Sequence, residues 1–329
     1  ARAMEGPVPD AATESAAARQ QPRRVLVFGW GAAAAEVLRE LAAYAGRGAA
    51  VVHCVSHVSQ AADCDLREVS AQHGFGCDLL DDNTEIHAVA SRFRPDLMLS
   101  ASYRKRIPGC ILDVCRDRIN FHPSLLPKHR GCWSGFWAIF EGDEETGVTC
   151  HHMVQEFDAG RILHQDRIQV ESTDTAVSLY RKLLPVTATC AKRVLVDYFA
   201  GGLPVGDEQS GPSSYHYRRL PFGGLIQPEW SDLQVDRFVR AMHFPPFEGA
   251  ALQLAPGGER IVVDTMEEFV SLRERATAVA AGPLAAAVVV AAEHSAVAAA
   301  AAATVPAVTT APSPGVRPTA VKHALPSAG

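Results

Sequence analysis

The chain has 329 residues, 47% of them hydrophobic, which is enough for one sizeable domain with a buried core and a smaller second domain. Its net charge of −6 argues against a general nucleic-acid-binding protein, because such proteins neutralise phosphates with clustered lysine and arginine side chains. The tightest basic cluster, Arg104-Lys105-Arg106, is too small to hold a large RNA.

Membrane, redox and targeting signals are weak. The longest apolar stretch, residues 276–303, is alanine and valine interrupted by Glu293 and His294, so no membrane-spanning helix is predicted. The eight cysteines form no C-x-x-C pair, which predicts free thiols in a reducing compartment. Residues 1–23 are predicted to be a disordered segment. Its acidic residues are atypical of a transit peptide, so we expect a cytoplasmic location and leave organellar targeting open.

The first part of the chain reads as alternating strands and helices. An apolar run at 24–31 ends in glycines, and apolar residues at helical spacing follow over 32–44. This alternation predicts an α/β fold with a Rossmann-like, mostly parallel sheet flanked by helices. Further strands are predicted at 50–55, 96–101, 119–122, 147–153 and 161–169, with helices near 84–92 and 173–199.

Three more segments follow from this pattern. Residues 24–204 are predicted to form the catalytic domain, because two glycines end the long helix there. Residues 205–275 are predicted to form a small α+β or β-rich domain with a helix at 230–242 and strands at 250–255 and 259–264. Residues 276–329 form a low-complexity tail rich in alanine and proline, to which we assign no function.

The glycine turn Gly29-Trp30-Gly31 suggests a dinucleotide site at first sight. The full fingerprint needs a third glycine and an acidic residue at the end of the second strand. Here the third position is Ala34, and the second strand ends in Ser56-His57. We therefore reject a nicotinamide cofactor and assign the glycines to the tight strand-to-helix turn.

The segment that carries chemistry follows the strand at 119–122. Strand side chains alternate between faces, so Asn120 and His122 project to the same side, about 7 Å apart. An amide that donates to a developing oxyanion, beside an imidazole that moves a proton, suits acyl transfer. An isolated N-x-H is more often a structural pair, so the interpretation needs the rest of the pattern.

That pattern extends over three separate motifs. Residues 120–131 read N-x-H-x-S-L-L-P-x-x-R-G, residues 147–149 read G-V-T, and residues 158–160 read D-x-G. Together they resemble the 10-formyltetrahydrofolate-dependent formyltransferases, a family that includes methionyl-tRNA, amino-sugar nucleotide and glycinamide ribonucleotide formyltransferases. The resemblance covers about residues 24–204.

The resemblance implies a catalytic role for three residues. Asn120 would donate a hydrogen bond to the formyl oxygen as it becomes an oxyanion, and His122 would be the general acid/base. Asp158 would lie beside His122 and raise its pKa, so that the imidazolium is populated near neutral pH.

The resemblance also implies a folate cleft built from backbone groups and aliphatic side chains. Some sugar-nucleotide members have an arginine after the R-G pair, where this chain has Cys132, so that contact is not expected. No metal is predicted: a site at His129, His151 or His152 would need a convergent third ligand, and we interpret all three as core or surface residues. The expected folate-binding residues are Ser124, Leu125, Leu126, Pro127, Val154, Gln155, Glu156, Phe157 and Asp158.

The acceptor amine is predicted from the C-terminal part. Residues 206–275 hold eleven acidic and seven basic residues, which repels a tRNA backbone. Residues 240–247 are similar to the R-A-M-x-F-P-P-F stretch of amino-sugar nucleotide formyltransferases, so we expect a nucleotide-linked amino sugar or similar small amine. For the aromatic candidates, packing in the core is an equally good explanation. The candidate acceptor-binding residues are Tyr103, Arg104, Arg130, Trp133, Phe244 and Phe247.

Several alternatives stay open at this point. A methionyl-tRNA formyltransferase with a reduced C-terminal domain is the main one, followed by a glycinamide ribonucleotide enzyme, a formyltetrahydrofolate hydrolase and a non-catalytic binder of folate or nucleotide. A homodimer is expected only by resemblance to the sugar-nucleotide enzymes.

Overall fold

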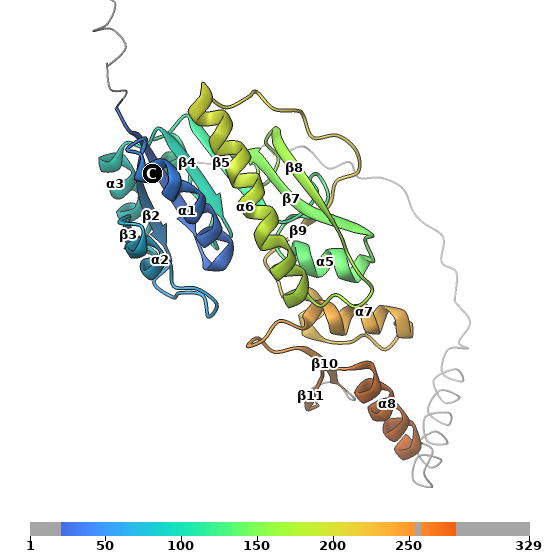
Figure 1. Ribbon diagram of the computed structural model, residues 1–329. Helices are drawn as coiled ribbons and strands as arrows, with labels where there is room; N and C mark the ends of the chain where they lie inside the picture. Colours follow the sequence, from blue (N-terminus) through green and yellow to red (C-terminus); the bar gives the residue numbers. More distant parts are fainter. Residues whose placement is uncertain (1–20, 254–257, 281–329) are drawn as a thin grey trace, which may run out of the picture. The chain divides into compact units, whose positions relative to one another are not determined.

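The computed structural model describes residues 21–253 and 258–280 (Figure 1). The disorder predicted for residues 1–23 and the tail predicted for 276–329 fall almost entirely outside these ranges. The chain divides into two compact units, 1–270 and 271–329, with helix α8 (Met266–Ala280) running across the boundary.

A seven-stranded sheet forms the centre of this unit, in the order β3-β2-β1-β4-β5-β7-β8. The first five strands in that order run parallel, whereas β5, β7 and β8 pair antiparallel. The predicted Rossmann-like, mostly parallel sheet is therefore confirmed. The strands are β1 (Arg23–Gly29), β2 (Ala50–Ser56), β3 (Gly76–Leu79), β4 (Leu97–Ala101), β5 (Asp117–His122), β7 (Glu145–His152) and β8 (Ile162–Gln169).

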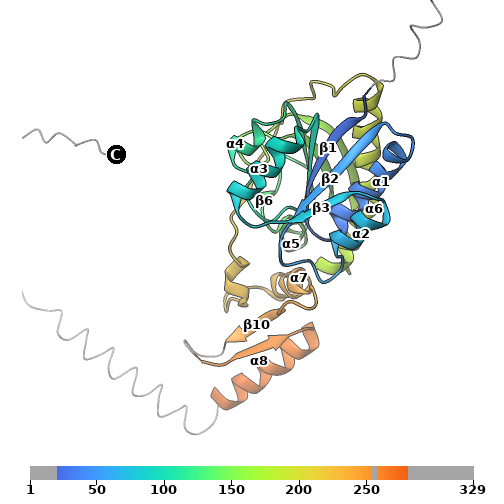
Figure 2. The same cartoon turned by 90° about the vertical axis from the view of Figure 1, so that its left-hand side faces the viewer.

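Helices cover both faces of the sheet, as Figure 2 shows. On one face, α1 packs against α2 and α6. On the other face, α3 and α4 cover a core cluster that includes Leu26, Phe28 and Met98. The helices are α1 (Gly31–Gly46), α2 (Leu66–Gln72), α3 (Asn83–Phe93), α4 (Gly109–Leu112) and α6 (Ala176–Ala200).

The degree of burial explains which helices and strands could be predicted from the sequence. The middle of β1, Val25–Phe28, is buried on both faces, as expected of a central parallel strand, and reads as a continuous apolar run. Helix α6 begins with a capping box between Thr175 and Ser178. By contrast, α2 and β3 were not predicted, because both are short and β3 has no fully buried residue.

Residues beyond α6 form smaller elements. Strand β9 (Tyr215–His216) pairs in parallel with β6 (Arg130–Gly131), and β10 (Ala250–Gln253) pairs antiparallel with β11 (Arg260–Val263). Helix α7 (Asp232–Met242) packs against α5 (Ser134–Glu141). The predicted helix and the two predicted strands of this segment are thus present. None of the helices in the described ranges is long and apolar enough to cross a membrane.

Candidate active site

Asn120 and His122 of β5 lie on the sheet face that carries α3 and α4. Asn120 pairs laterally with Ser100 of β4 and with His151 of β7, and laterally paired residues point to the same face. Met98, two residues before Ser100, packs against α3 and α4, which fixes that face. At the end of β5, the segments around residues 129–131 and 153–158 lie over this face: the His129 carbonyl contacts His122, and the Gly131 N–H contacts Asp158.

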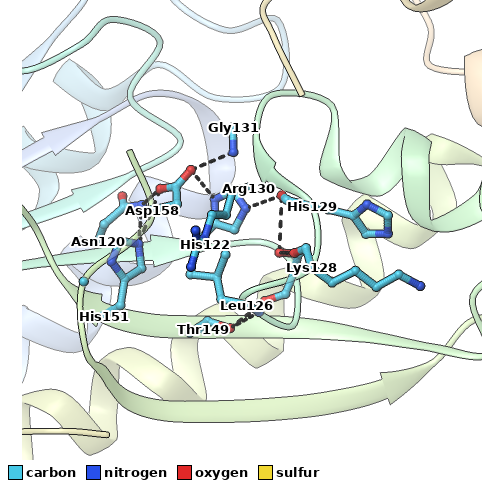
Figure 3. A network of polar contacts seen from close by, with 12 residues as sticks. Asn120, His122, Leu126, Lys128, His129, Arg130, Gly131, Thr149, His151 and Asp158 are labelled. Carbon is cyan, nitrogen blue, oxygen red and sulfur yellow. Dashed lines mark hydrogen bonds and ion pairs between the residues drawn. The ribbon is translucent and has the colours of Figure 1, made fainter. Parts of the chain in front are cut away.

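Asp158 joins these side chains into one cluster (Figure 3). Its Oδ1 accepts a hydrogen bond from Asn120 Nδ2 at 3.3 Å, and its Oδ2 lies 3.6 Å from His122 Nδ1. Oδ2 also accepts from the backbone N–H of Gly131 at 2.8 Å. The structure thus brings together all three predicted catalytic residues, which are 38 positions apart in the chain at most.

Two glycines make this approach of the loops feasible. Gly131 has φ of +87°, where side chains are disfavoured, and a Cβ there would collide with the backbone oxygen of His216. Gly160 packs so closely on the backbone of His152 that a Cβ would collide with its oxygen. The G of R-G and the G of D-x-G therefore serve backbone packing around Asp158.

The hydrogen bonds of His122 identify the nitrogen that takes up a proton. Its Nε2 lies 2.8 Å from the backbone oxygen of His129. A carbonyl can only accept, so Nε2 carries the hydrogen in the neutral ring. The basic nitrogen is therefore Nδ1, which faces Asp158.

Burial overrides the expected effect of Asp158 on His122. The His122 side chain is buried, and this burial lowers its pKa below the usual 6.5, although the Asp158 carboxylate acts in the opposite direction. Burial also raises the pKa of Asp158, but His122, His151 and the Gly131 N–H outweigh it, so the net pKa of that carboxyl is lowered. The prediction of a raised His122 pKa is wrong: a neutral imidazole faces a carboxylate at neutral pH.

One residue of the cluster was missed by the sequence analysis. His151 is 2% exposed, and its Nε2 lies 3.2 Å from Asn120 Nδ2 and 3.5 Å from Asp158 Oδ1. Its neighbour His152 faces away and contacts the backbone oxygen of Pro204. The two histidines do face opposite sides, as predicted, but the strand register that places His151 opposite Asn120 could not be read from β7 alone.

Comparison with known proteins gives this cluster its context. Residues 23–195 match the formyl transferase family. The chain belongs to the formyl transferase family. It is 42% identical to the GDP-perosamine N-formyltransferase of Brucella melitensis over 189 residues. This alignment covers 57% of this chain and 71% of the Brucella protein.

Solved structures share the fold of this formyltransferase. A sugar N-formyltransferase from a Shewanella species superimposes with a TM-score of 0.61 and 18% identity, covering 73% of this chain and 96% of that one. An N-formyltransferase from Helicobacter canadensis, in complex with folinic acid and dTDP-3-aminofucose, gives a TM-score of 0.56 and 17% identity over 68% of this chain and 81% of that one.

Thr149, the threonine of the G-V-T motif, stabilises the turn that the S-L-L-P residues of this formyltransferase form. Its hydroxyl donates to the Ser124 backbone oxygen at 2.6 Å and accepts from the Leu126 N–H at 3.1 Å. The side chains of Ser124 and Leu126 are buried, and the peptide bond between Leu126 and Pro127 is cis. These residues shape the loop; their predicted contacts with folate stay a prediction.

A groove of about 550 Å³ is lined by residues that precede and follow Asp158 in the chain, although Asp158 itself does not line it. Glu156 and Phe157 line it from the segment predicted to bind folate, and Arg130 lines it from the segment before α5. Val154 and Phe157 are exposed, at 39% and 46%. The remaining lining residues are Ala159, Ser213, Ser214, Tyr215 and Tyr217.

Contacts with Arg106 hold the predicted folate segment in place. Arg106 donates to the Gln155 backbone oxygen at 3.1 Å, and its guanidinium lies 5.5 Å from the centre of the Phe157 ring. Leu125 lies elsewhere, in a separate cavity of about 360 Å³ beside Lys128. The predicted folate residues therefore divide between the groove, the buried turn and this second cavity.

The six predicted acceptor-binding residues lie in several places. Arg130 reaches into the groove and donates to Gln209 Oε1. Trp133, at the start of α5, is 43% exposed. Phe244 packs beside Tyr180 of α6, and Phe247 lies next to it with 59% of its surface exposed.

Tyr103 and Arg104 follow β4. The Tyr103 ring stacks on His57 at 4.4 Å, and the Arg104 guanidinium lies 4.6 Å from the centre of the Trp30 ring, in the glycine turn. This pair is therefore tied to the ends of β1 and β2 rather than to the groove.

One group of potential metal ligands exists within the described ranges. The donor atoms of His129, Glu141 and His216 lie within 4.8 Å of one another. The group includes none of the predicted catalytic residues, and a hydrogen bond between the two imidazoles at 3.0 Å accounts for their closeness. The prediction that no metal is used stays a prediction.

Proposed function

We propose that the protein transfers a formyl group from 10-formyltetrahydrofolate to the amino group of a nucleotide-linked amino sugar. The observation that carries this proposal is the single carboxylate of Asp158 in contact with both Asn120 and His122. The named activity of the Brucella relative and the two ligands of the Helicobacter enzyme support the choice of substrates.

In the first step, the unprotonated amine attacks the formyl carbon. Its lone pair forms the new C–N bond, and the carbonyl electrons move onto the formyl oxygen. Asn120 Nδ2 donates a hydrogen bond to this oxyanion. A preorganised donor of this kind in a buried site contributes about 3 kcal/mol to stabilisation of the transition state.

In the second step, His122 moves the proton. Its neutral Nδ1 accepts the proton lost by the attacking nitrogen, and Asp158 stabilises the imidazolium that forms. The imidazolium then returns this proton to the folate nitrogen as the bond between that nitrogen and the formyl carbon breaks. A neutral resting imidazole suits this order, because the ring must first act as a base.

The groove lined by Glu156, Phe157 and Ala159 supports binding of the folate. Its volume lies within the usual range for small-molecule pockets, about 300–1,000 Å³. Phe157 and Tyr215 offer ring faces at its wall, and Arg130 offers a cation for a carboxylate. We assign residues 24–204 to the catalytic domain and residues 205–275 to the acceptor side.

Charge argues against the tRNA alternative. Residues 206–275 carry eleven acidic and seven basic residues, a net charge that disfavours a phosphate backbone. A nucleotide-linked sugar presents only two phosphates, which one or two arginines can hold.

The test is an assay of the purified full chain with 10-formyltetrahydrofolate and a panel of nucleotide-linked amino sugars. We expect release of tetrahydrofolate and a product about 28 Da heavier than one of these amines. Charged initiator methionyl-tRNA and glycinamide ribonucleotide serve as competing acceptors.

Each alternative gives a different result. Formylation of the tRNA, with tight and salt-sensitive binding, would replace our proposal by the methionyl-tRNA activity. Tetrahydrofolate release without any acceptor would identify a hydrolase. Folate binding without turnover in any assay would identify a non-catalytic binder.

A further inference from the structure

Gln209 lies outside the predicted catalytic domain, but its side chain reaches the turn that carries Asp158. Its Nε2 donates to the backbone oxygens of Asp158 and Gly160, at 2.7 and 2.8 Å. Its Oε1 accepts from Nε and Nη2 of the Arg130 guanidinium, at 3.0 and 2.5 Å. Gln209 therefore joins the loop of the D-x-G motif to the loop of the R-G pair.

The partners of the Gln209 amide determine its orientation. Carbonyls can only accept, so the two hydrogens on Nε2 are directed to the oxygens of Asp158 and Gly160. A guanidinium can only donate, so the amide oxygen faces Arg130. Each hydrogen and each lone pair of the amide thus has one partner, and a flipped amide would lose all four hydrogen bonds.

The backbone of Asp158 has a conformation that benefits from such support. Its φ is +52°, in the left-handed region that residues with a side chain rarely adopt. The same residue places its carboxylate against Asn120 and His122. A movement of the Asp158 backbone would therefore displace the carboxylate from both partners.

The segment that carries Gln209 is itself anchored to the sheet. Asp207 exchanges two backbone hydrogen bonds with Ile162 at the start of β8, each of 2.8 Å. Arg161 Nε donates to the Gly206 oxygen at 2.9 Å. Gln209 follows two residues after Asp207, so its amide extends from a fixed backbone.

From these contacts we propose that Gln209 is a positioning residue, which holds the turn of Asp158 so that its carboxylate stays beside His122. The inference rests on the proposed function, in which Asp158 stabilises the imidazolium of His122. Gln209 is not among the described residues that line the groove, and it acts through Asp158. The segment 205–275, assigned to the acceptor side, thus contributes to the site of proton transfer.

Two replacements of Gln209 separate its donors from its acceptor. Gln209→Met has similar length and no charge but removes every hydrogen bond of the amide, and we expect kcat to fall about tenfold. Gln209→Glu keeps an oxygen toward Arg130 but has no hydrogen for the two carbonyls, and we expect at least the same loss. An unchanged kcat in Gln209→Glu, or a change confined to the KM for folate in both variants, would show that Gln209 acts through Arg130 alone and would overturn the proposal.

The pH dependence of kcat distinguishes positioning from loss of stability. The titratable groups that act on His122 are Asp158, His151 and His129, and Gln209→Met replaces none of them. Asp158 acts to raise the His122 pKa, so a carboxylate that is held less closely should move the acid limb of kcat to lower pH, by about 0.5–1 unit. A lower melting temperature with an unmoved limb would mean that Gln209 only stabilises the fold.

A control variant and a double-mutant cycle test whether the effect passes through Asp158. Glu208→Gln is the matched control, because Glu208 is adjacent in the chain and its exposed side chain pairs with Arg161 instead. Its kcat and acid limb should equal those of the parent. In an Asp158→Asn background, Gln209→Met should cause no further shift of the limb. A shift in the control, or an additive shift in the double variant, would contradict the proposed route.

A measurement without turnover keeps this inference separate from the proposed function. NMR titration of the histidine-labelled full chain, with His122 assigned by its loss in His122→Gln, gives the pKa of His122 directly. We expect this pKa to be lower in Gln209→Met than in the parent. An unchanged pKa would overturn the positioning role even in an active enzyme. If the pKa falls but no substrate is turned over in any assay, the proposed function fails while the positioning of Asp158 stands.

Discussion

Two clusters lie on either side of the segment that links β5 to α5, and they are held together differently. The polar cluster consists of Asn120, His122, His151 and Asp158, joined by directional contacts of 3.2 to 3.6 Å. The aromatic cluster joins α5, α7 and the residues between, with ring centres 4.8 to 6.1 Å apart at many angles. Its members are Phe136, Trp137, Phe140, Phe222, Trp230 and Phe238.

This difference between the two clusters predicts whether a single substitution affects the chemistry or the stability of the fold. A hydrogen-bonded cluster depends on which atom faces which, so a substitution of similar size can abolish its chemistry while the fold survives. A cluster of rings depends on filled volume and tolerates changes that keep the volume. The four predictions below test that contrast.

The largest effect is expected at His122. His122→Gln keeps a polar group near the His129 carbonyl but cannot take up a proton, so kcat should fall about 10²- to 10⁴-fold, the usual contribution of a general acid/base. The measurement is the initial rate of tetrahydrofolate release. Its melting temperature should stay close to that of the parent; an active variant would remove His122 from the mechanism.

The opposite profile is expected at Phe238, which is fully buried and contacts Phe136 and Trp230. Phe238→Ala should lower the free energy of unfolding by about 3–5 kcal/mol, measured by urea titration. Phe238→Leu is the control and should lose less, because it fills part of the volume. A large loss of kcat in folded Phe238→Leu would show that the aromatic cluster is coupled to the chemistry.

The next effect concerns pH and comes from Asp158. Burial keeps the His122 pKa below 6.5, so the rate should be level at neutral pH and fall only as the pH drops through that lowered pKa. Asp158 acts to raise this pKa, so Asp158→Asn should move the acid limb to lower pH by about 1–3 units. The measurement is kcat against pH; a limb that moves upward would contradict the assigned charge states.

The smallest effect is expected at Thr149, which lies outside the polar cluster and stabilises the turn at Ser124 and Leu126. Thr149→Val removes the partner of the Leu126 N–H and the Ser124 carbonyl, and should lower the free energy of unfolding by about 1–3 kcal/mol. Thr149→Ser keeps the hydroxyl and should lose less. Equal losses would mean that the methyl group, not the hydroxyl, stabilises the turn.

Much of the fold could be predicted from the sequence, because its buried strands and helices have a recognisable pattern of apolar residues. The central strands are continuous apolar runs, and the long helix ends at two glycines, so both could be located from pattern alone. Helix α2 and strand β3 could not, because short, half-exposed elements at the sheet edge carry little periodicity.

The candidate site was predictable in its residues but not in its electrostatics. Alternation along β5 and the spacing of three motifs selected Asn120, His122 and Asp158. The direction of the His122 pKa depends on how completely the loops exclude water, which no local pattern reveals. His151 required the β5–β7 register, a property of two strands rather than one.

The register of β7 also limits how this enzyme could change in length. Its pairing with β8 is already irregular between Cys150 and His151, whereas its pairing with β5 runs unbroken from Thr149 to His152. If a one-residue insertion or deletion between Glu145 and Cys150 made β7 slip by one residue against β5, every side chain of β7 would turn to the other face, and His152 instead of His151 would point to the face of Asn120. A homologue with such a slip could retain every motif residue and still lose the contact between His151 and Asn120.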